Sequence, residues 1–117
     1  MGEALGAALI GGSLYELEAG QRSFPYHFEQ AREEWLLVVD GSPTLRTPDG
    51  ERELRAGDVV CFPVGVAGAH QVIGPGRILM LSTLELPTVA EYPDSAKVNV
   101  DGRVFRIADE ADYWEGE

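Results

Sequence analysis

The sequence is short of basic residues, of long apolar runs and of cysteine, and each shortage excludes a class of protein. Its 117 residues include 9 Lys and Arg against 20 Asp and Glu, so the formal net charge is −11. Because so acidic a chain repels phosphate backbones and anionic headgroups, we expect neither nucleic acid nor a membrane among its partners. No stretch approaches the roughly 18 consecutive apolar residues of a transmembrane helix.

The only cysteine, Cys61, has no second cysteine with which to form an internal disulfide. A chain without disulfides fits the reducing cytoplasm. The apolar N-terminal segment also lacks the Lys or Arg that normally precedes the apolar run of a secretory signal. We therefore expect a cytoplasmic protein. We also expect Cys61 to be a buried thiol, because it lies in an apolar run beside Phe62.

Short runs of β-branched, aliphatic and aromatic residues, interrupted by 14 Gly and 7 Pro, make up most of the chain. Such a pattern is typical of many short strands rather than of helices. We expect strands at residues 13–18, 26–29, 34–40, 44–47, 52–55, 59–62, 69–73, 77–86, 97–100 and 104–107. About eight to ten strands in a chain of this length predict an all-β sandwich or barrel in one domain.

Three segments carry further expectations. Residues 34–40 are apolar almost throughout, which favours a strand buried on both faces. Residues 91–95 are expected to form an ordered loop. The acidic tail at 109–117 contains Tyr113 and Trp114, and we expect these aromatic side chains to pack the tail against the body of the protein.

The chain has only two histidines, His27 and His70, and two carboxylates accompany the first of them. His27 and Glu29 share one face of a strand, because residues two apart in a strand point the same way. Glu34 begins the next apolar run. Two imidazoles and two carboxylates that converge inside a barrel could bind a divalent ion such as Mn, Fe, Ni or Zn. In the alternative interpretation, the carboxylates face solvent and the histidines form local hydrogen bonds.

The spacing of these residues resembles the two motifs of the cupin family, and both histidines fall on motif positions. The first motif is matched by Gly20, His27, Glu29, Glu34 and Gly41, with six residues between Glu34 and the final glycine.

The second cupin motif is matched by Gly57, Pro63, Gly65 and His70. The resemblance implies a double-stranded β-helix, which is a jelly-roll barrel of antiparallel strands. It also implies one cupin domain over residues 1–117, of the small bacterial conserved-barrel type. Within it we place motif 1 at about 20–41, motif 2 at about 57–74 and a C-terminal extension at about 87–117. By the same resemblance, the metal ligands would be His27, Glu29, Glu34 and His70.

The match departs from the family pattern at three places. Glu29 stands where the family has its second histidine, the gap before His70 is two residues longer than usual, and Gly74 stands where an asparagine often closes motif 2. The first departure touches a ligand position. Because carboxylate oxygen is a harder ligand than imidazole nitrogen, it disfavours Cu and favours Zn, Mn or Fe.

The resemblance implies a divalent-metal-binding protein that acts on, or binds, a small oxygenated molecule. If the protein is an enzyme, it would be an isomerase, a dioxygenase or a decarboxylase. A binding module without turnover and a metal-free structural cupin are the alternatives. The resemblance also implies a homodimer.

Other residues around the predicted barrel carry weaker signals. Arg22 and Arg46 could hold an anionic substrate at the barrel mouth, although exposed arginines are common. Leu36, Phe62 and Met80 are candidate walls of the pocket by strand alternation, and core packing accounts for them equally well.

Overall fold

The computed structural model describes residues 2–117, which form eleven strands, three short 3₁₀ segments and no α-helix. The strands are β1 (Ile10–Leu17), β2 (Phe28–Glu29), β3 (Glu34–Gly41), β4 (Thr44–Thr47), β5 (Gly50–Glu53), β6 (Val59–Phe62), β7 (Gln71–Ile73), β8 (Gly76–Thr83), β9 (Val89–Tyr92), β10 (Lys97–Val100) and β11 (Arg103–Arg106). The 3₁₀ segments are η1 (Glu3–Leu5), η2 (Val66–Gly68) and η3 (Ile107–Asp109). None of the helical segments in the described part of the chain is long and apolar enough to cross a bilayer.

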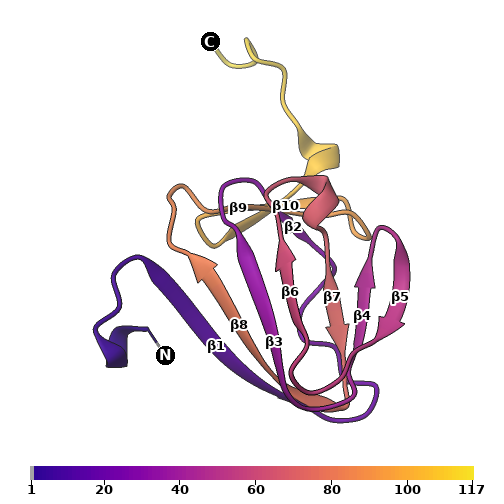
Figure 1. The fold of residues 1–117 in the computed structure, drawn as a ribbon. Coiled ribbons are helices and arrows are strands. Elements are labelled where there is room, and N and C mark those ends of the chain that lie inside the picture. The colour runs from indigo at the N-terminus through magenta and orange to yellow at the C-terminus, as the bar shows by residue number, and fades with distance from the viewer. Residues whose placement is uncertain (1) are drawn as a thin grey trace.

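All the strand pairings are antiparallel, and they build three sheets. The orders are β1-β8-β3-β6, β5-β4-β7 and β11-β10-β9-β2. The first two sheets form the walls of a barrel, and β2, β9 and β10 lie across its upper end (Figure 1). The predicted all-β jelly-roll barrel is therefore confirmed.

Strand alternation sets the core. On β3, Leu36 and Val38 point inward and are buried, and β8 contributes Ile78 and Met80 to the same core. Burying one such side chain stabilises the fold by about 1.5–3 kcal/mol. This core fills the lower part of the barrel, and beyond Leu36 polar side chains join the apolar ones.

The outer face of β3 corrects the prediction of a strand buried on both faces. Trp35 is 46 % exposed and Val39 is 45 % exposed, because no element within residues 2–117 covers this face of the sheet. Cys61 lies on the same sheet, opposite Trp35 on β6, and is also exposed. The expectation of a buried thiol was therefore wrong.

Several strand boundaries differ from the prediction. β1 begins at Ile10 rather than at residue 13, β5 spans Gly50–Glu53 rather than 52–55, and β7 begins at Gln71 rather than at residue 69. Only residues 28–29 of the run at 26–29 form a strand, and His27 pairs separately with His70 in an isolated bridge. β8 ends at Thr83 rather than at residue 86. The predicted loop at 91–95 is wrong in its first part, because β9 extends to Tyr92 and pairs with β2 and β10.

The C-terminal tail also differs from its prediction. After η3 the chain extends away from the barrel (Figure 1), and Tyr113 and Trp114 are 85 % and 73 % exposed. The two rings contact each other edge to face, with centroids 5.2 Å apart, instead of packing on the body. Aromatic composition alone was a poor indicator of docking here, because the tail has no apolar partner surface beside it.

Candidate metal centre

A pair of backbone hydrogen bonds brings the two histidines side by side. The N–H of His27 donates to the carbonyl of His70 over 3.2 Å, and the N–H of His70 donates back over 2.9 Å. Their ring centroids are 5.0 Å apart. Residues 43 positions apart in the sequence thus come together through an isolated antiparallel bridge, one position away from β2 and β7.

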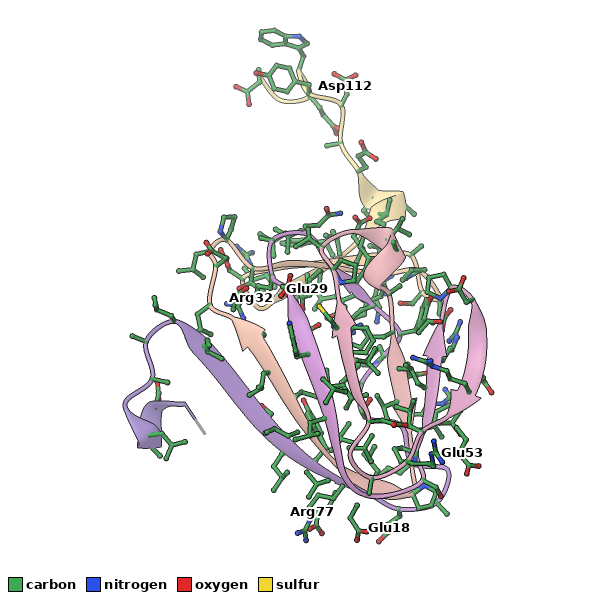
Figure 2. The ribbon with its side chains drawn as sticks, in the orientation of Figure 1. Glu18, Glu29, Arg32, Glu53, Arg77 and Asp112 are labelled. Carbon is green, nitrogen blue, oxygen red and sulfur yellow. The ribbon has the colours of Figure 1, made fainter. Side chains whose placement is uncertain are left out.

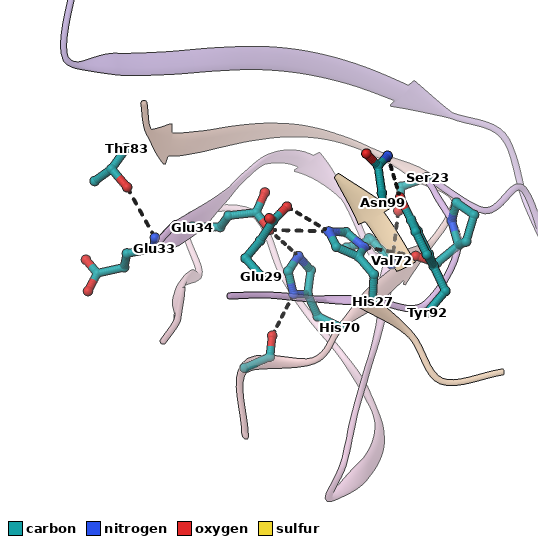
Figure 3. Close-up of polar contacts among 12 residues, drawn as sticks. Ser23, His27, Glu29, Glu33, Glu34, His70, Val72, Thr83, Tyr92 and Asn99 are labelled. Atoms are coloured by element: carbon teal, nitrogen blue, oxygen red, sulfur yellow. Dashed lines mark hydrogen bonds and ion pairs between the residues drawn. The ribbon is translucent and has the colours of Figure 1, made fainter. Parts of the chain in front are cut away.

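The two carboxylates reach the same point from neighbouring strands. Glu34 is the first residue of β3, and its Oε1 lies 3.5 Å from Nε2 of His27 and 3.4 Å from Nε2 of His70. Glu29, on β2, places its Oε1 3.5 Å from Nε2 of His27. Figure 3 shows the four side chains pointing toward one another from separate stretches of backbone.

Three of these residues have the spacing of a metal site. One ligand atom each from His27, Glu34 and His70 lie within 4.8 Å of one another. Two ligands at about 2.1 Å from a tetrahedral ion are roughly 3.4 Å apart by geometry, which is close to the separations between Glu34 and the two imidazoles. Glu29 lies outside this closer group and contacts it through His27.

Backbone carbonyls orient both imidazoles toward the centre. Nδ1 of His27 lies 3.0 Å from the carbonyl oxygen of Pro25, and Nδ1 of His70 lies 2.8 Å from that of Gly68. Since a carbonyl only accepts, each Nδ1 carries a hydrogen. A neutral ring then presents the lone pair of Nε2 to the centre. This is the arrangement in which protein imidazoles bind metals.

Gly68 is needed for this orientation because the backbone turns tightly beneath His70. A Cβ at residue 68 would lie 1.9 Å from the carbonyl oxygen of Pro63, which is far inside van der Waals contact. The two residues belong to the segment between β6 and β7 that is longer than the usual second motif. The longer loop therefore still delivers the carbonyl that His70 requires.

Three polar atoms in the centre are buried and have no hydrogen-bond partner among the described residues. They are Oε2 of Glu29, Oε1 of Glu34 and Nε2 of His70. A buried polar group without a partner costs about 1–3 kcal/mol. All three are of the types that bind divalent cations, so a bound cation would remove a cost that the fold otherwise carries.

The two histidines differ in their affinity for protons. Burial lowers the pKa of His27, but its contacts with Glu29 and Glu34 outweigh burial and raise that pKa to about 10. Burial dominates at His70 and lowers its pKa. Without a cation, the centre therefore holds a proton on His27, between the carboxylates. A metal would have to displace this proton.

Aromatic rings and an open cleft surround the centre. Phe62 stacks on His70 with ring centroids 3.7 Å apart, and Phe24 meets both imidazoles edge to face. A cleft of about 570 Å³ opens onto His27 and Glu34. Its lining comprises Gly2, Glu3, Ala7, Gly11, Gly12, Ser13, Tyr15, Phe24, His27, Arg32, Glu34, Met80, Leu81, Ser82 and Leu84.

The predicted pocket walls have different positions in the structure. Met80 lines the cleft, Phe62 lies against His70, and Leu36 belongs to the core below. Neither Arg22 nor Arg46 lines the cleft. Arg46 instead makes two hydrogen bonds to Asp94, at 2.7 and 2.9 Å.

The arginine that does line the cleft is Arg32, which the sequence reasoning missed. Its position two residues before Glu34 could have identified it as a candidate. In extended backbone, that spacing places both side chains on one face.

Comparison with known proteins identifies the family. The family model described as "Cupin domain" matches residues 13–83, which include both motifs and all four candidate ligands. The chain belongs to the cupin family. Among curated proteins, none matches this cupin.

Two solved structures resemble this cupin over most of its length. One is a sugar phosphate isomerase of the cupin superfamily from Silicibacter pomeroyi, with 26 % identity and a TM-score of 0.83 over 94 % of this chain and 75 % of that one. The other, from Acidithiobacillus ferrooxidans, is provisionally assigned as a sugar phosphate isomerase. It has 28 % identity and the same TM-score of 0.83, over 94 % of this chain and 75 % of that one.

A third structure shares the fold at lower similarity. It is a polyketide cyclase from Streptomyces resistomycificus, with 24 % identity and a TM-score of 0.60 over 74 % of this chain and 63 % of that one. The cupin fold thus occurs in proteins of different named activities. The ligand role of His27, Glu29, Glu34 and His70 stays a prediction, supported by their convergence.

Proposed function

We propose that this cupin binds one divalent metal ion and acts on a small oxygenated molecule in the cleft above it. The observation that carries the proposal is the set of three buried, unpartnered ligand atoms on Glu29, Glu34 and His70. In a metal-free structural cupin, the proton on His27 would offset part of this desolvation cost for the carboxylates, but Nε2 of His70 and Oε2 of Glu29 would stay unpaired. Zn, Mn, Fe and Ni all suit a mixed set of imidazole and carboxylate ligands.

We assign His27, Glu34 and His70 as the three central ligands and Glu29 as the fourth. The Nδ1 bonds to Pro25 and Gly68 hold the two rings in place, and Phe62 packs against His70 so that its ring cannot turn away. An ion with these ligands would supply a Lewis acid with positions left for substrate oxygens. Phe24 and Met80 give the cleft part of an apolar lining.

Of the three reaction types expected from the sequence, we favour isomerisation of a sugar-like substrate. Two structural neighbours that align with 94 % of this chain, at 26 % and 28 % identity, bear the name sugar phosphate isomerase, the second of them provisionally. Isomerisation moves hydrogen within one molecule and needs neither an oxidant nor a second substrate. A single cleft of about 570 Å³ is of the size that holds one small molecule.

The test combines metal analysis with turnover. Protein purified without a histidine tag is loaded in turn with Zn, Mn, Fe and Ni, and its metal content is measured. Each form is then assayed for conversion of a panel of sugars and sugar phosphates. We expect one equivalent of metal and metal-dependent conversion, both lost in His70→Ala. Metal content well below one equivalent under every condition would contradict the metal centre. Metal binding without conversion would favour the non-catalytic binding module.

Three further expectations from the sequence stay predictions. They are the single cupin domain over residues 1–117, the cytoplasmic location and the homodimer. The exposed outer face that carries Trp35, Val39 and Val59 is the surface that we propose a homodimer covers, since one chain leaves it open to water.

A further inference from the structure

The cleft above the metal centre contains one cationic side chain. Of its lining residues within the described part of the chain, Arg32 is the only arginine or lysine. The whole chain has a formal net charge of −11, and Glu3 and Glu34 also line this cleft. A single guanidinium in this setting marks the one part of the cleft that would attract an anionic group.

The backbone around Glu33 aims Arg32 toward the same side as Glu34. The N–H of Thr83 donates to the carbonyl of Glu33 over 3.1 Å, which extends the β3–β8 pairing to the residue before the start of β3. On the outer face, Nε1 of Trp35 donates to the carboxylate of Glu33 over 2.9 Å. Since neighbouring side chains alternate in extended backbone, Arg32 and Glu34 lie on the opposite side, facing the cleft.

One hydrogen bond anchors the guanidinium and leaves most of its donors available. Nε of Arg32 donates to the carbonyl of Glu85 over 3.1 Å. No carboxylate among residues 2–117 forms an ion pair with Arg32, whereas Arg46 is paired with Asp94 and Arg77 with Glu16. The two terminal nitrogens of Arg32 retain the fork geometry that matches the oxygens of a phosphate or carboxylate.

We propose that Arg32 is the binding residue for an oxyanion group, phosphate or carboxylate, on the ligand of this cleft. The inference rests on the proposed function, because it assigns the second end of a molecule whose hydroxyl or carbonyl oxygens face the metal centre. The cleft also contains the hydroxyl groups of Ser13, Tyr15 and Ser82, which can donate further hydrogen bonds to the same group. The substrate class is thereby narrowed to anionic, oxygenated small molecules.

In the competing interpretation, Arg32 only holds the chain after β8 through its bond to Glu85. A measurement of anion binding to the metal-free protein distinguishes the two roles.

Inorganic phosphate and acetate are titrated separately into chelator-treated, metal-free protein by calorimetry. The proteins are wild type, Arg32→Gln, Arg32→Lys and the matched control Arg77→Gln, which makes the same charge change at the opposite end of the barrel (Figure 2). Thermal melting checks that each variant is folded, and Arg32→Lys keeps the charge if Arg32→Gln fails to fold.

We expect saturable binding of at least one anion to the wild type. Its affinity should fall by about tenfold or more in Arg32→Gln, by less in Arg32→Lys, and stay within about twofold in Arg77→Gln. The anion that binds more tightly identifies phosphate or carboxylate as the group. Equal affinity in wild type and Arg32→Gln would overturn the proposal, and so would the absence of saturable binding of both anions to the wild type. A failed metal centre would show separately, as absent metal binding in the wild type with the anion result unchanged.

Discussion

The upper end of the barrel and the C-terminal tail both combine aromatic and acidic side chains, yet the two regions are organised very differently. At the barrel end, His27, His70 and Glu34 are held by a backbone bridge, by carbonyl acceptors and by the start of β3. In the tail, the rings of Tyr113 and Trp114 meet edge to face and are mostly exposed. Side chains placed by a β-ladder therefore converge, whereas side chains beyond the last strand do not.

The two regions should differ most in how much a mutation in each lowers the stability of the fold. Leu36 is fully buried below the metal centre, so Leu36→Ala should lower the free energy of unfolding by about 2–5 kcal/mol. Trp114→Ala removes a larger side chain from the tail and should change it by no more than about 0.5 kcal/mol. Urea denaturation of both variants and the wild type measures this. Similar losses for both would mean that the tail packs on the body in solution.

The second prediction concerns the ligands. A divalent cation present at about 100 times its dissociation constant should stabilise the wild type by about 2.7 kcal/mol. His70→Ala and Glu34→Gln should remove this stabilisation, because the first deletes a ligand nitrogen and the second replaces a ligand carboxylate with a neutral amide, which is a much weaker ligand. Thermal melting with and without metal gives the comparison, and Glu33→Gln, one residue away on the outer face, is the matched control. Undiminished metal-induced shifts in His70→Ala and Glu34→Gln would contradict the ligand assignment.

The third prediction concerns the ion pair between Arg46 and Asp94, which should make a smaller, pH-dependent contribution to the stability of the fold. The guanidinium of Arg46, which donates two hydrogen bonds to Asp94, holds the pKa of Asp94 below its usual value of 3.8. A lowered pKa in the folded state stabilises the fold above the usual pKa, and this contribution is lost as the pH falls through the lowered one. The stability difference between wild type and Asp94→Asn should therefore shrink below about pH 4.

Urea denaturation across a pH series measures that difference. Arg77→Gln, which breaks another exposed ion pair, serves as the control for a general effect of charge. A difference that stays constant from neutral to acidic pH would show that the contact between Arg46 and Asp94 contributes nothing in solution.

The smallest effect should follow removal of the tail. Truncation after β11 deletes η3 and the exposed aromatic residues, and it should change the free energy of unfolding by no more than about 0.5 kcal/mol. Metal affinity should stay the same, because none of the deleted residues lines the cleft. A large loss of either would mean that the tail contributes to the barrel or to its site.

The sequence predicted the barrel and its candidate site better than the exposed surface and the C-terminal tail. The convergence of the two histidines with Glu29 and Glu34 was expected from the resemblance to the cupin motifs. Strand alternation by itself placed only His27 and Glu29 on one face. Arg32 was missed because its position depends on the extension of the ladder to Glu33 and Thr83. The exposure of Cys61 and Trp35 was also missed, since apolar residues on one strand do not reveal whether another element covers their outer face.

The central claim is that His27, Glu34 and His70, with Glu29, bind one divalent ion. A crystal structure of metal-loaded protein, with anomalous data collected at the absorption edge of the added metal, tests it most directly. The account predicts one strong peak at the convergence point, within about 2.0–2.2 Å of Nε2 of both histidines and of a Glu34 oxygen. Fully loaded crystals with no peak at this point, or with a peak bound only by surface carboxylates, would contradict it.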